Sequence, residues 1–465
     1  MKKNLLHIIT ANIFYLLIVA GTNFILPKFT SIEVYAATKE YTLYLTTYSG
    51  ILTLGYLQGM YVEYGGKKLE KTDPRNLGEN IVSFFLFMLP ISLIITVAGV
   101  RLHNIIISVL GIGILSTNLQ SYYQMLYQAT GEFKAYSVAL NASRVGLLAV
   151  YLILIFVVKT DSMILYVGAA PFVGVLSAVY LTVRLQHRIP FLRASWFSPA
   201  RINSNIRSGF ILMLGDFVTK FFSSLDRWFV NTLMDTFSFA MYSFAVSMDN
   251  LVNTFMTPVT VSMFNYFCRK PAAAEIRRMK DAALIYSFII IAGAYPIKWI
   301  LENFMTEYIS SSDIIFPLYA AQGLSAIVKG IYVNKYKAEG EQKRYLVQMV
   351  SMLVLAAVSN VIFYAGYQSM LSFAWATLFT NAVWLLICEL QCKEIRYEKR
   401  TITGVVILVS VYLLTGYFCH SILGCVIYCM SGVFVGMTLM HESFVSVIGS
   451  ILENVRQKKR GKHDF

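Results

Sequence analysis

Seven charged side chains lie inside long apolar stretches of this 465-residue chain, and they are the side chains best placed to bind a polar ligand. A charged group at membrane depth costs about 2.5–3.5 kcal/mol on insertion scales, so it normally faces the protein interior or water. We therefore treat these residues as candidates for a substrate cavity. They are Arg144, Asp216, Lys220, Asp226, Arg227, Asp249 and Lys329.

Four polar residues in one stretch follow helical spacing. Asp216, Lys220, Ser223 and Arg227 are separated by four, three and four residues, which places them on one face of a continuous helix. Two alternatives stay open. Asp216 and Lys220 could neutralise each other as an i,i+4 ion pair, and Arg227 could extend to the membrane interface beside Trp228.

Uncharged polar side chains recur on neighbouring stretches at similar intervals. The simplest arrangement gathers them with the charged residues around a hydrated central cleft, although such stripes also serve helix–helix packing in membranes. The amide candidates for the cavity are Asn12, Asn23, Gln124, Asn141, Asn250 and Asn253.

The elements that must position these residues are apolar segments, each long enough to cross a bilayer. A spanning helix needs about 20 mainly apolar residues. With 57% hydrophobic residues, 14% charged residues and a mean hydropathy of +0.60, the chain is predicted to be an all-α integral membrane protein with about 14 transmembrane helices. The predicted spans are 5–26, 41–62, 80–99, 104–128, 135–158, 162–184, 207–233, 238–267, 280–300, 313–336, 344–366, 370–392, 402–420 and 422–440.

The distribution of basic residues predicts the orientation of these helices. Of the 39 Lys and Arg residues, 30 fall at the two ends of the chain or at alternate connectors, and only five fall at the other connectors. Since basic connectors stay on the cytosolic side, both termini are expected in the cytosol. The net charge of +14 then reflects topology and contact with anionic lipids, and no nucleic-acid partner is expected.

A ten-residue motif occurs twice. Residues 127–136 (YQATGEFKAY) and 336–345 (YKAEGEQKRY) are identical at six positions, at an offset of 209. Each copy joins two consecutive predicted spans, and the two copies lie six helices apart, as in transporters built from parallel repeats. Gly131 and Gly340 are expected to take a positive φ that ends one helix before the next.

This repeat divides the predicted chain into two lobes and an appended pair of helices. The connector between the lobes holds Trp196 and Phe197 among several arginines, a composition typical of a segment lying in the membrane interface. The predicted parts are an N-terminal six-helix lobe (1–184), a cytosolic interfacial linker (185–206), a C-terminal six-helix lobe (207–392), helices 13 and 14 (393–441) and a basic cytosolic tail (442–465).

Three short segments resemble bacterial polysaccharide flippases of the multidrug, oligosaccharidyl-lipid and polysaccharide exporter superfamily. They are residues 59–67 (GMYVEYGGK), residues 226–229 (DRWF) with 242–245 (YSFA), and Tyr308 followed by residues 332–335 (YVNK). Glu63 departs from the family pattern, in which a basic residue is expected, so the resemblance does not imply capture of an anion at that edge.

The resemblance implies two lobes that alternate in access and move an undecaprenyl-pyrophosphate-linked oligosaccharide across the bacterial cytoplasmic membrane, as in O-antigen or capsule export. It implies no enzyme activity, catalytic residue, metal or cofactor, although a proton or sodium gradient could drive transport. The expected partners are the lipid-linked substrate, membrane lipids, a polysaccharide polymerase and glycosyltransferases. A cation-coupled multidrug antiporter, with Asp216 or Asp249 as the ion site, is the main alternative, and a membrane glycan ligase or polymerase is a third.

Arg144 provides a direct test of the flippase prediction. The substitution Arg144→Ala is expected to abolish assembly of the surface glycan while leaving membrane insertion intact, because it removes a cation from membrane depth. Surface glycan on cells carrying the variant, compared with its amount in the membrane, measures this effect. Normal glycan output would remove Arg144 from the candidates, and a changed drug sensitivity with intact glycan would favour the antiporter.

Overall fold

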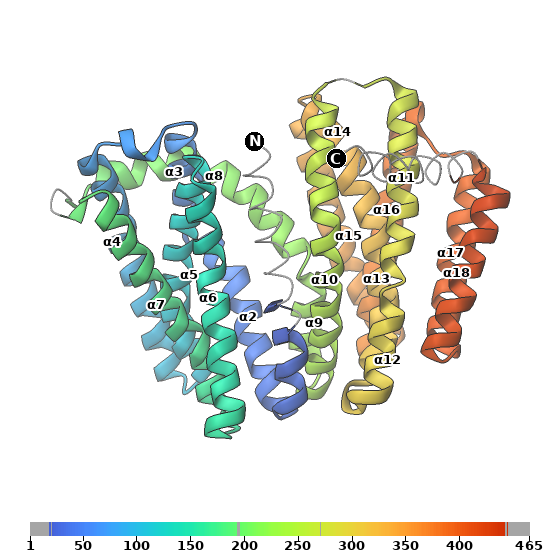
Figure 1. The fold of residues 1–465 in the computed structure, drawn as a ribbon, viewed down its shortest axis with the longest axis horizontal. Helices are drawn as coiled ribbons and strands as arrows, with labels where there is room; N and C mark the ends of the chain where they lie inside the picture. The colour runs from blue at the N-terminus through green and yellow to red at the C-terminus, as the bar shows by residue number, and fades with distance from the viewer. Residues whose placement is uncertain (1–17, 20, 193–195, 270, 442–443, 445–465) are drawn as a thin grey trace, which may run out of the picture. The chain divides into compact units, whose positions relative to one another are not determined.

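The computed structural model describes residues 18–19, 21–192, 196–269, 271–441 and 444, and every regular element in this part of the chain is a helix (Figure 1). The chain divides into two compact units, residues 1–240 and 241–465. The first unit extends past the predicted lobe boundary at 207 because α8 packs against α2, α3 and α4. The duplication of the two lobes remains a prediction.

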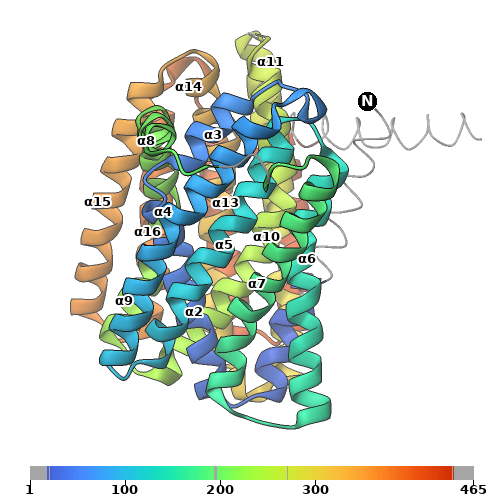
Figure 2. The same ribbon diagram turned by 90° about the vertical axis from the view of Figure 1, so that its left-hand side faces the viewer.

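The first unit is built around α5, which packs against both α4 and α7 (Figure 2). Several helices begin at a side chain that caps a free backbone N–H group: Ser31 accepts from Val34, Asn104 from Ile107 and Ser198 from Arg201. The helices are α2 (Ile32–Leu52), α3 (Tyr56–Tyr64), α4 (Pro74–Arg101), α5 (Ile105–Ala129), α6 (Phe133–Leu152), α7 (Met163–Arg188), α8 (Pro199–Phe222) and α9 (Leu225–Leu233).

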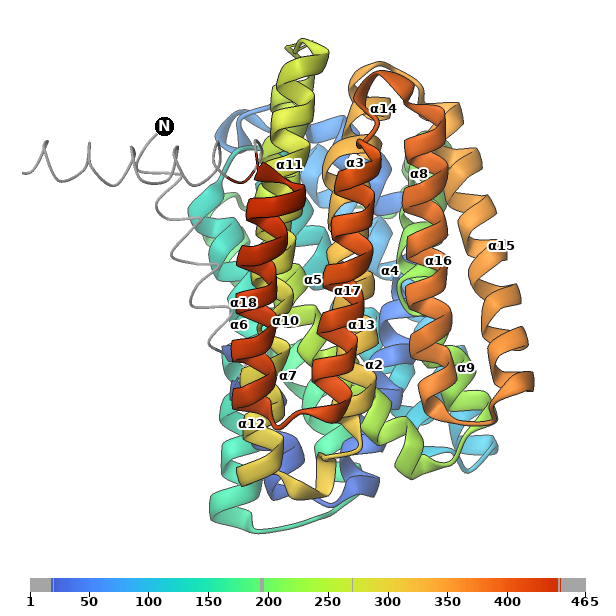
Figure 3. The ribbon, with the colours of Figure 1, turned by 90° about the vertical axis from the view of Figure 1, so that its right-hand side faces the viewer.

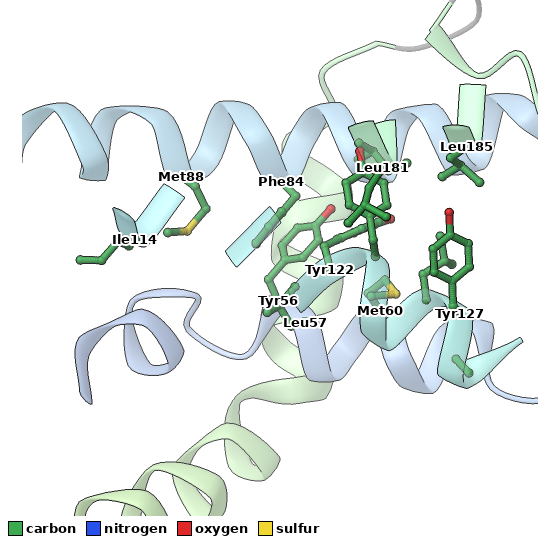
Figure 4. Close-up of a cluster of buried hydrophobic side chains, with 14 of the residues drawn as sticks. Tyr56, Leu57, Met60, Phe84, Met88, Ile114, Tyr122, Tyr127, Leu181 and Leu185 are labelled. Carbon is green, nitrogen blue, oxygen red and sulfur yellow. The ribbon is translucent and has the colours of Figure 1, made fainter. Parts of the chain in front are cut away.

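Aromatic side chains form much of the core of this unit. Figure 4 shows Tyr56 of α3, Phe84 of α4 and Tyr122 of α5 packed in a row. The ring centroids are 4.9 Å apart for Tyr56 and Phe84 and 5.5 Å apart for Phe84 and Tyr122. Both tyrosine hydroxyls donate hydrogen bonds to Asn80, so these rings bury apolar area without leaving a polar group unpaired.

In the second unit, α13 is almost wholly buried and packs against α11, α16 and α17. Figure 3 shows α17 beside α18, and Lys298 of α12 donates to the last carbonyls of α17 at Gly416 and Cys419 (2.7 and 2.8 Å), a favourable position for a cation. The helices are α10 (Thr236–Phe267, starting in the first unit), α11 (Ala273–Ile291), α12 (Ala294–Phe304), α13 (Ser311–Ile327), α14 (Asn334–Ala338), α15 (Gln342–Gly366), α16 (Met370–Gln391), α17 (Lys399–Phe418) and α18 (Ser421–Leu439).

Within the described residues, ten helices are long and apolar enough to cross a membrane, and the bent pair α8–α9 makes an eleventh. The chain is therefore a multi-pass membrane protein, while the predicted number of fourteen spans is not confirmed. Most of predicted span 5–26 lies outside the described residues. Predicted span 41–62 is interrupted: α2 begins nine residues earlier, at Ile32, and ends at Leu52.

Two breaks in the first unit interrupt predicted spans. Between α2 and α3, Leu54 and Gly55 take positive φ values of 49° and 90°. Between α8 and α9 the axis bends by 55°, and the hydroxyls of Ser223 and Ser224 bond the carbonyls of Thr219 and Lys220, in competition with the helical ladder. The predicted single face from Asp216 to Arg227 is therefore wrong, because Arg227 belongs to a separate helix.

The two copies of the ten-residue motif form the same turn. Gly131 and Gly340 have φ values of 76° and 77°, which confirms the predicted positive φ. In the first copy the Glu132 N–H bonds the Tyr127 carbonyl at 2.8 Å, and in the second the Glu341 N–H bonds the Tyr336 carbonyl at 2.9 Å. Both are Schellman caps, in which glycine frees the chain to turn back on the last carbonyls.

Glycines allow α3 and α8 to approach until their backbones touch. A Cβ on Gly209 would overlap the Gly55 carbonyl and the Gly59 N–H, and a Cβ on Gly59 would overlap the backbone of Asn205. Small residues spaced four apart allow this close packing in membrane helices. The contact sets the spacing of the polar groups that these two helices carry.

This contact predicts a specific loss of stability. Gly209→Ala should destabilise the folded protein by about 3 kcal/mol, because an added methyl group overpacks a contact with backbone atoms that cannot move aside. Gly215→Ala on the same helix should have little effect, since a Cβ there meets no atom within 4 Å. Thermal unfolding of both variants in detergent measures the difference, and equal melting temperatures would contradict the proposed contact.

Candidate functional site

A line of polar side chains follows the contact between α2–α3 and α8–α9 in the first unit. We call it the polar seam. Its members lie on four helices that touch one another as α2–α8, α2–α9 and α3–α8. They are Lys39, Glu40, Tyr44, Thr47, Gln58 and Glu63 on the first pair of helices, and Arg201, Asp216, Lys220, Arg227, Trp228 and Asn231 on the second.

The middle of the polar seam holds Asp216 and Lys220. Asp216 accepts a hydrogen bond from the Gln58 amide at 3.2 Å, and the Lys220 ammonium lies next to Gly50. Both side chains are exposed, and no ion pair within 4.0 Å joins these two described residues. The ion pair between Asp216 and Lys220, one of the alternatives left open by the sequence, is therefore absent from the structure.

A small cavity of about 10 Å³ separates these groups, between Thr47, Gly50, Met213 and Phe217. That is about the room required by one water molecule. Asp216 and Lys220 line this cavity and are exposed, so a polar ligand can reach both side chains.

Aromatic packing joins α9 to α2 further along the polar seam. The Trp228 indole donates to the Thr47 hydroxyl at 3.1 Å and stacks on Tyr44, with ring centroids 5.2 Å apart. The Tyr44 hydroxyl accepts from Asn231 and donates to Glu40 at 2.7 Å. Trp228 is thus held in place by packing, and Arg227 sits beside it in a half-buried position.

Lys39 is a member of the polar seam that the sequence interpretation missed. Its ammonium donates to Asn23 at 3.2 Å, lies 5.2 Å from the centroid of the Tyr35 ring, and is acted on by the like charge of Arg227. The predicted spans leave Lys39 in a connector because the polar run 38–42 lowers the local hydropathy. A capping serine at 31, followed by helix-forming residues, is the signal that α2 begins earlier.

The end of the polar seam at α3 is an ion-pair network. Arg201 of α8 donates to Glu63 at 2.7 Å and to Asn76 at 3.0 Å, and it lies 3.9 Å from Glu79. Glu63 also accepts from the amide of Asn80, at 3.1 Å. The acidic residue that departs from the family pattern is therefore neutralised by a cation from α8.

The other candidates of the first unit lie off the polar seam or outside the described residues. Gln124 lies on α5. Asn141 and Arg144 lie on α6, where the Asn141 amide donates to the Ser137 carbonyl at 3.0 Å. Asp226 is buried and accepts from the Arg227 backbone N–H at 2.8 Å. Asn12 falls in the part of the chain that the structure does not describe.

In the second unit Asp249 lies close enough to Lys329 for their charges to interact. Lys329 lies on a π-helical segment (Val328–Val333) that continues α13, and such segments often occur at functional sites. Asn250, which follows Asp249 directly on α10, and Asn253, one turn after Asp249, are exposed. Ser243 and Ser247, earlier on α10, are buried among packed side chains.

A second buried charge cluster in this unit escaped the sequence interpretation. Lys280 and Glu389 form an ion pair at 2.6 Å, with side chains that are 1% and 5% exposed. The Tyr332 hydroxyl and the Tyr397 N–H also donate to Glu389, and Lys280 lies over the Tyr397 ring at 3.5 Å. Burial, followed by Asp281 and Glu389, raises the pKa of Tyr397 well above its usual range, so this ring stays neutral.

Comparison with solved structures identifies the fold. The lipid II flippase MurJ in an inward-closed conformation matches with a TM-score of 0.66 at 14% identity, over 96% of this chain and 100% of that one. An inward-facing MATE-family multidrug resistance transporter of the MOP superfamily matches at 0.55, with 12% identity over 85% and 98% of the two chains. The chain has the fold of these transporters.

The MATE multidrug transporter DinF-BH has the same fold, with a TM-score of 0.53 at 14% identity over 81% of this chain and 91% of that one. No protein-family model and no curated protein matches the sequence. The MATE-family neighbour described above belongs to the MOP superfamily, the superfamily that the sequence motifs resemble. The sequence identities of these neighbours with this chain are too low to assign its substrate.

The ion pair at the α3 end of the polar seam gives a stability prediction. Arg201→Gln or Glu63→Gln should each destabilise the protein by about 2 kcal/mol, because either change leaves a part-buried charge without its partner. The double variant should recover part of that loss, which a double-mutant cycle by thermal unfolding would measure. Arg75→Gln is the control, since the Arg75 side chain is 69% exposed in its pair with Glu79.

Proposed function

We propose that this protein is a flippase that moves a lipid-linked oligosaccharide on an undecaprenyl pyrophosphate carrier across the bacterial cytoplasmic membrane by alternating access. The product would serve the synthesis of a cell-surface polysaccharide. The observation that best supports this proposal is the full-length likeness to a lipid II flippase, which covers 96% of this chain compared with 85% and 81% for two multidrug transporters.

The polar seam offers the chemistry that such a substrate requires. A pyrophosphate needs cations at close range, and Lys39, Lys220 and Arg227 supply three positive charges on neighbouring helices. A glycan needs hydroxyl, amide and aromatic partners. In the proposal, Gln58 and Asn231 supply the amides and Trp228 the ring face, while Asp216 accepts from sugar hydroxyls.

A cation-coupled multidrug antiporter is the second candidate, and two observations favour it. Multidrug transporters are among the structural neighbours, and the second unit carries a carboxylate, Asp249, in contact with the charge of Lys329. In this alternative, Asp249 would bind the coupling proton or sodium ion in exchange for a cationic drug.

Reconstituted transport separates the two proposals. In liposomes that contain the purified protein, a fluorescent undecaprenyl-pyrophosphate oligosaccharide should move between leaflets, as detected by protection of the fluorophore from a membrane-impermeant quencher. Lys220→Gln should slow this movement by about tenfold, because a lost charge-assisted hydrogen bond is worth about 1.5–3 kcal/mol. Lys68→Gln, at an exposed lysine in the loop before α4, is the matched control and should be neutral.

Two results would contradict the flippase proposal. The first is movement of the lipid-linked oligosaccharide at the rate of protein-free liposomes. The second is uptake of a fluorescent cationic drug, driven by a proton or sodium gradient and lost in Asp249→Asn, which would support the antiporter instead.

A further inference from the structure

An open groove runs between the first half of α15 and the end of α16 in the second unit, two helices that lie side by side in Figure 3. Its volume is about 720 Å³, within the range of small-molecule sites. One end is lined by the polar groups of Lys343, Arg344 and Gln391, and the rest is lined mainly by apolar side chains such as Val347, Met352 and Ile387. The groove thus has a polar end and a mainly apolar remainder, which match the headgroup and the acyl chains of a lipid.

The polar end carries an excess of positive charge at a helix N-terminus. Arg344 is held by Glu341 at 2.8 Å and by Gln391 at 3.3 Å, while Lys343 is exposed. Glu341 starts α15 without a side-chain cap on its free N–H groups. Two cations in the first turn of a helix are repelled by the positive end of the helix dipole. An anion bound there would offset this repulsion and accept hydrogen bonds from the free N–H groups.

Gln348, one turn further along α15, has one amide atom without a partner. Its side chain lines the groove and is 6% exposed, its nitrogen bonds the Cys388 sulfur at 3.3 Å, and its oxygen has no hydrogen-bond partner. Exchanging the nitrogen and oxygen of the Gln348 amide leaves the shape of the side chain unchanged. The Cys388 thiol would then donate to the oxygen, and the amide N–H would be the group left without a partner, at a buried position in the wall of the groove.

The outer face of α15 indicates what lies beyond the groove. Val347, Val350, Val354 and Val358 are exposed and follow helical spacing. A face this apolar over three turns suits hydrocarbon and not a water-filled passage. The groove therefore opens toward the acyl chains of the bilayer, with its cationic end at the leaflet that the charge pattern predicts to be cytosolic.

We propose that this groove binds an anionic glycerophospholipid. The phosphate would lie between Lys343, Arg344 and the first turn of α15, and one acyl chain would lie over Val347, Met352 and Ile387. The site is separate from the polar seam, and the proposal holds for either transported substrate. Such a lipid would tie the ends of α15 and α16 together.

Native mass spectrometry of the full-length protein in detergent tests the proposal, with phosphatidylglycerol as the probe. The double variant K343Q/R344Q should bind phosphatidylglycerol about tenfold more weakly, because it loses charge-assisted bonds to the phosphate. K399Q/R400Q removes the same charge from two exposed residues of α17 and should bind as the unchanged protein does. Equal binding by the two double variants would overturn the proposal.

A second substitution tests the acyl-chain part without a change of charge. Val347→Trp should fill the groove and weaken binding of phosphatidylglycerol, whereas Val358→Trp, three turns along the same exposed face, should not. Phosphatidylethanolamine, which carries no net charge, should bind at least about tenfold more weakly than phosphatidylglycerol. Tighter binding of undecaprenyl phosphate, which is not a glycerophospholipid, or equal binding of the two phospholipids would overturn the assignment.

Discussion

The structure depends on one constraint: a charge or a hydrogen-bonding group placed in hydrocarbon must find a polar partner within the protein. This chain meets the constraint with short-range partners. Arg201 is held by Glu63 on a neighbouring helix, Lys280 is held by Glu389, and Lys39 is held by Asn23. The first two pairings join helices that are distant in sequence, whereas Lys39 and Asn23 are 16 residues apart. Each pairing helps to fix the packing of the segments that carry it.

Broken helices follow from the same constraint. The break between α2 and α3 brings Gly55 and Gly59 against Gly209, and this backbone contact brings Gln58 within reach of Asp216. At the bend between α8 and α9, the hydroxyls of Ser223 and Ser224 bond the carbonyls of Thr219 and Lys220, and the Thr219 carbonyl also accepts from the Ser223 backbone N–H. Polar contacts and helix breaks therefore occur together along the polar seam, where straight helices would separate them.

The sequence predicted the parts that depend on local composition. Apolar length identified most of the spans, and the glycines of the repeated motif predicted the two turns correctly. It could not predict partners across space. Asp216 and Lys220 are spaced for an ion pair, yet Asp216 binds Gln58 because the break after Leu52 turns α3 toward α8. Lys280 and Glu389 are 109 positions apart and near span ends, so no spacing rule links them.

The repeated turn shows how one local structure acquires two uses. Both copies are closed by the same backbone bonds around a glycine with positive φ, but the acidic residue that follows is held differently. Glu132 is bound by Arg188 at the end of α7, which ties the α5–α6 turn to a third helix. Glu341 is bound by Arg344 within its own helix. Because that pair is local, it leaves the space beside α15 unfilled, and the groove against α16 occupies this space.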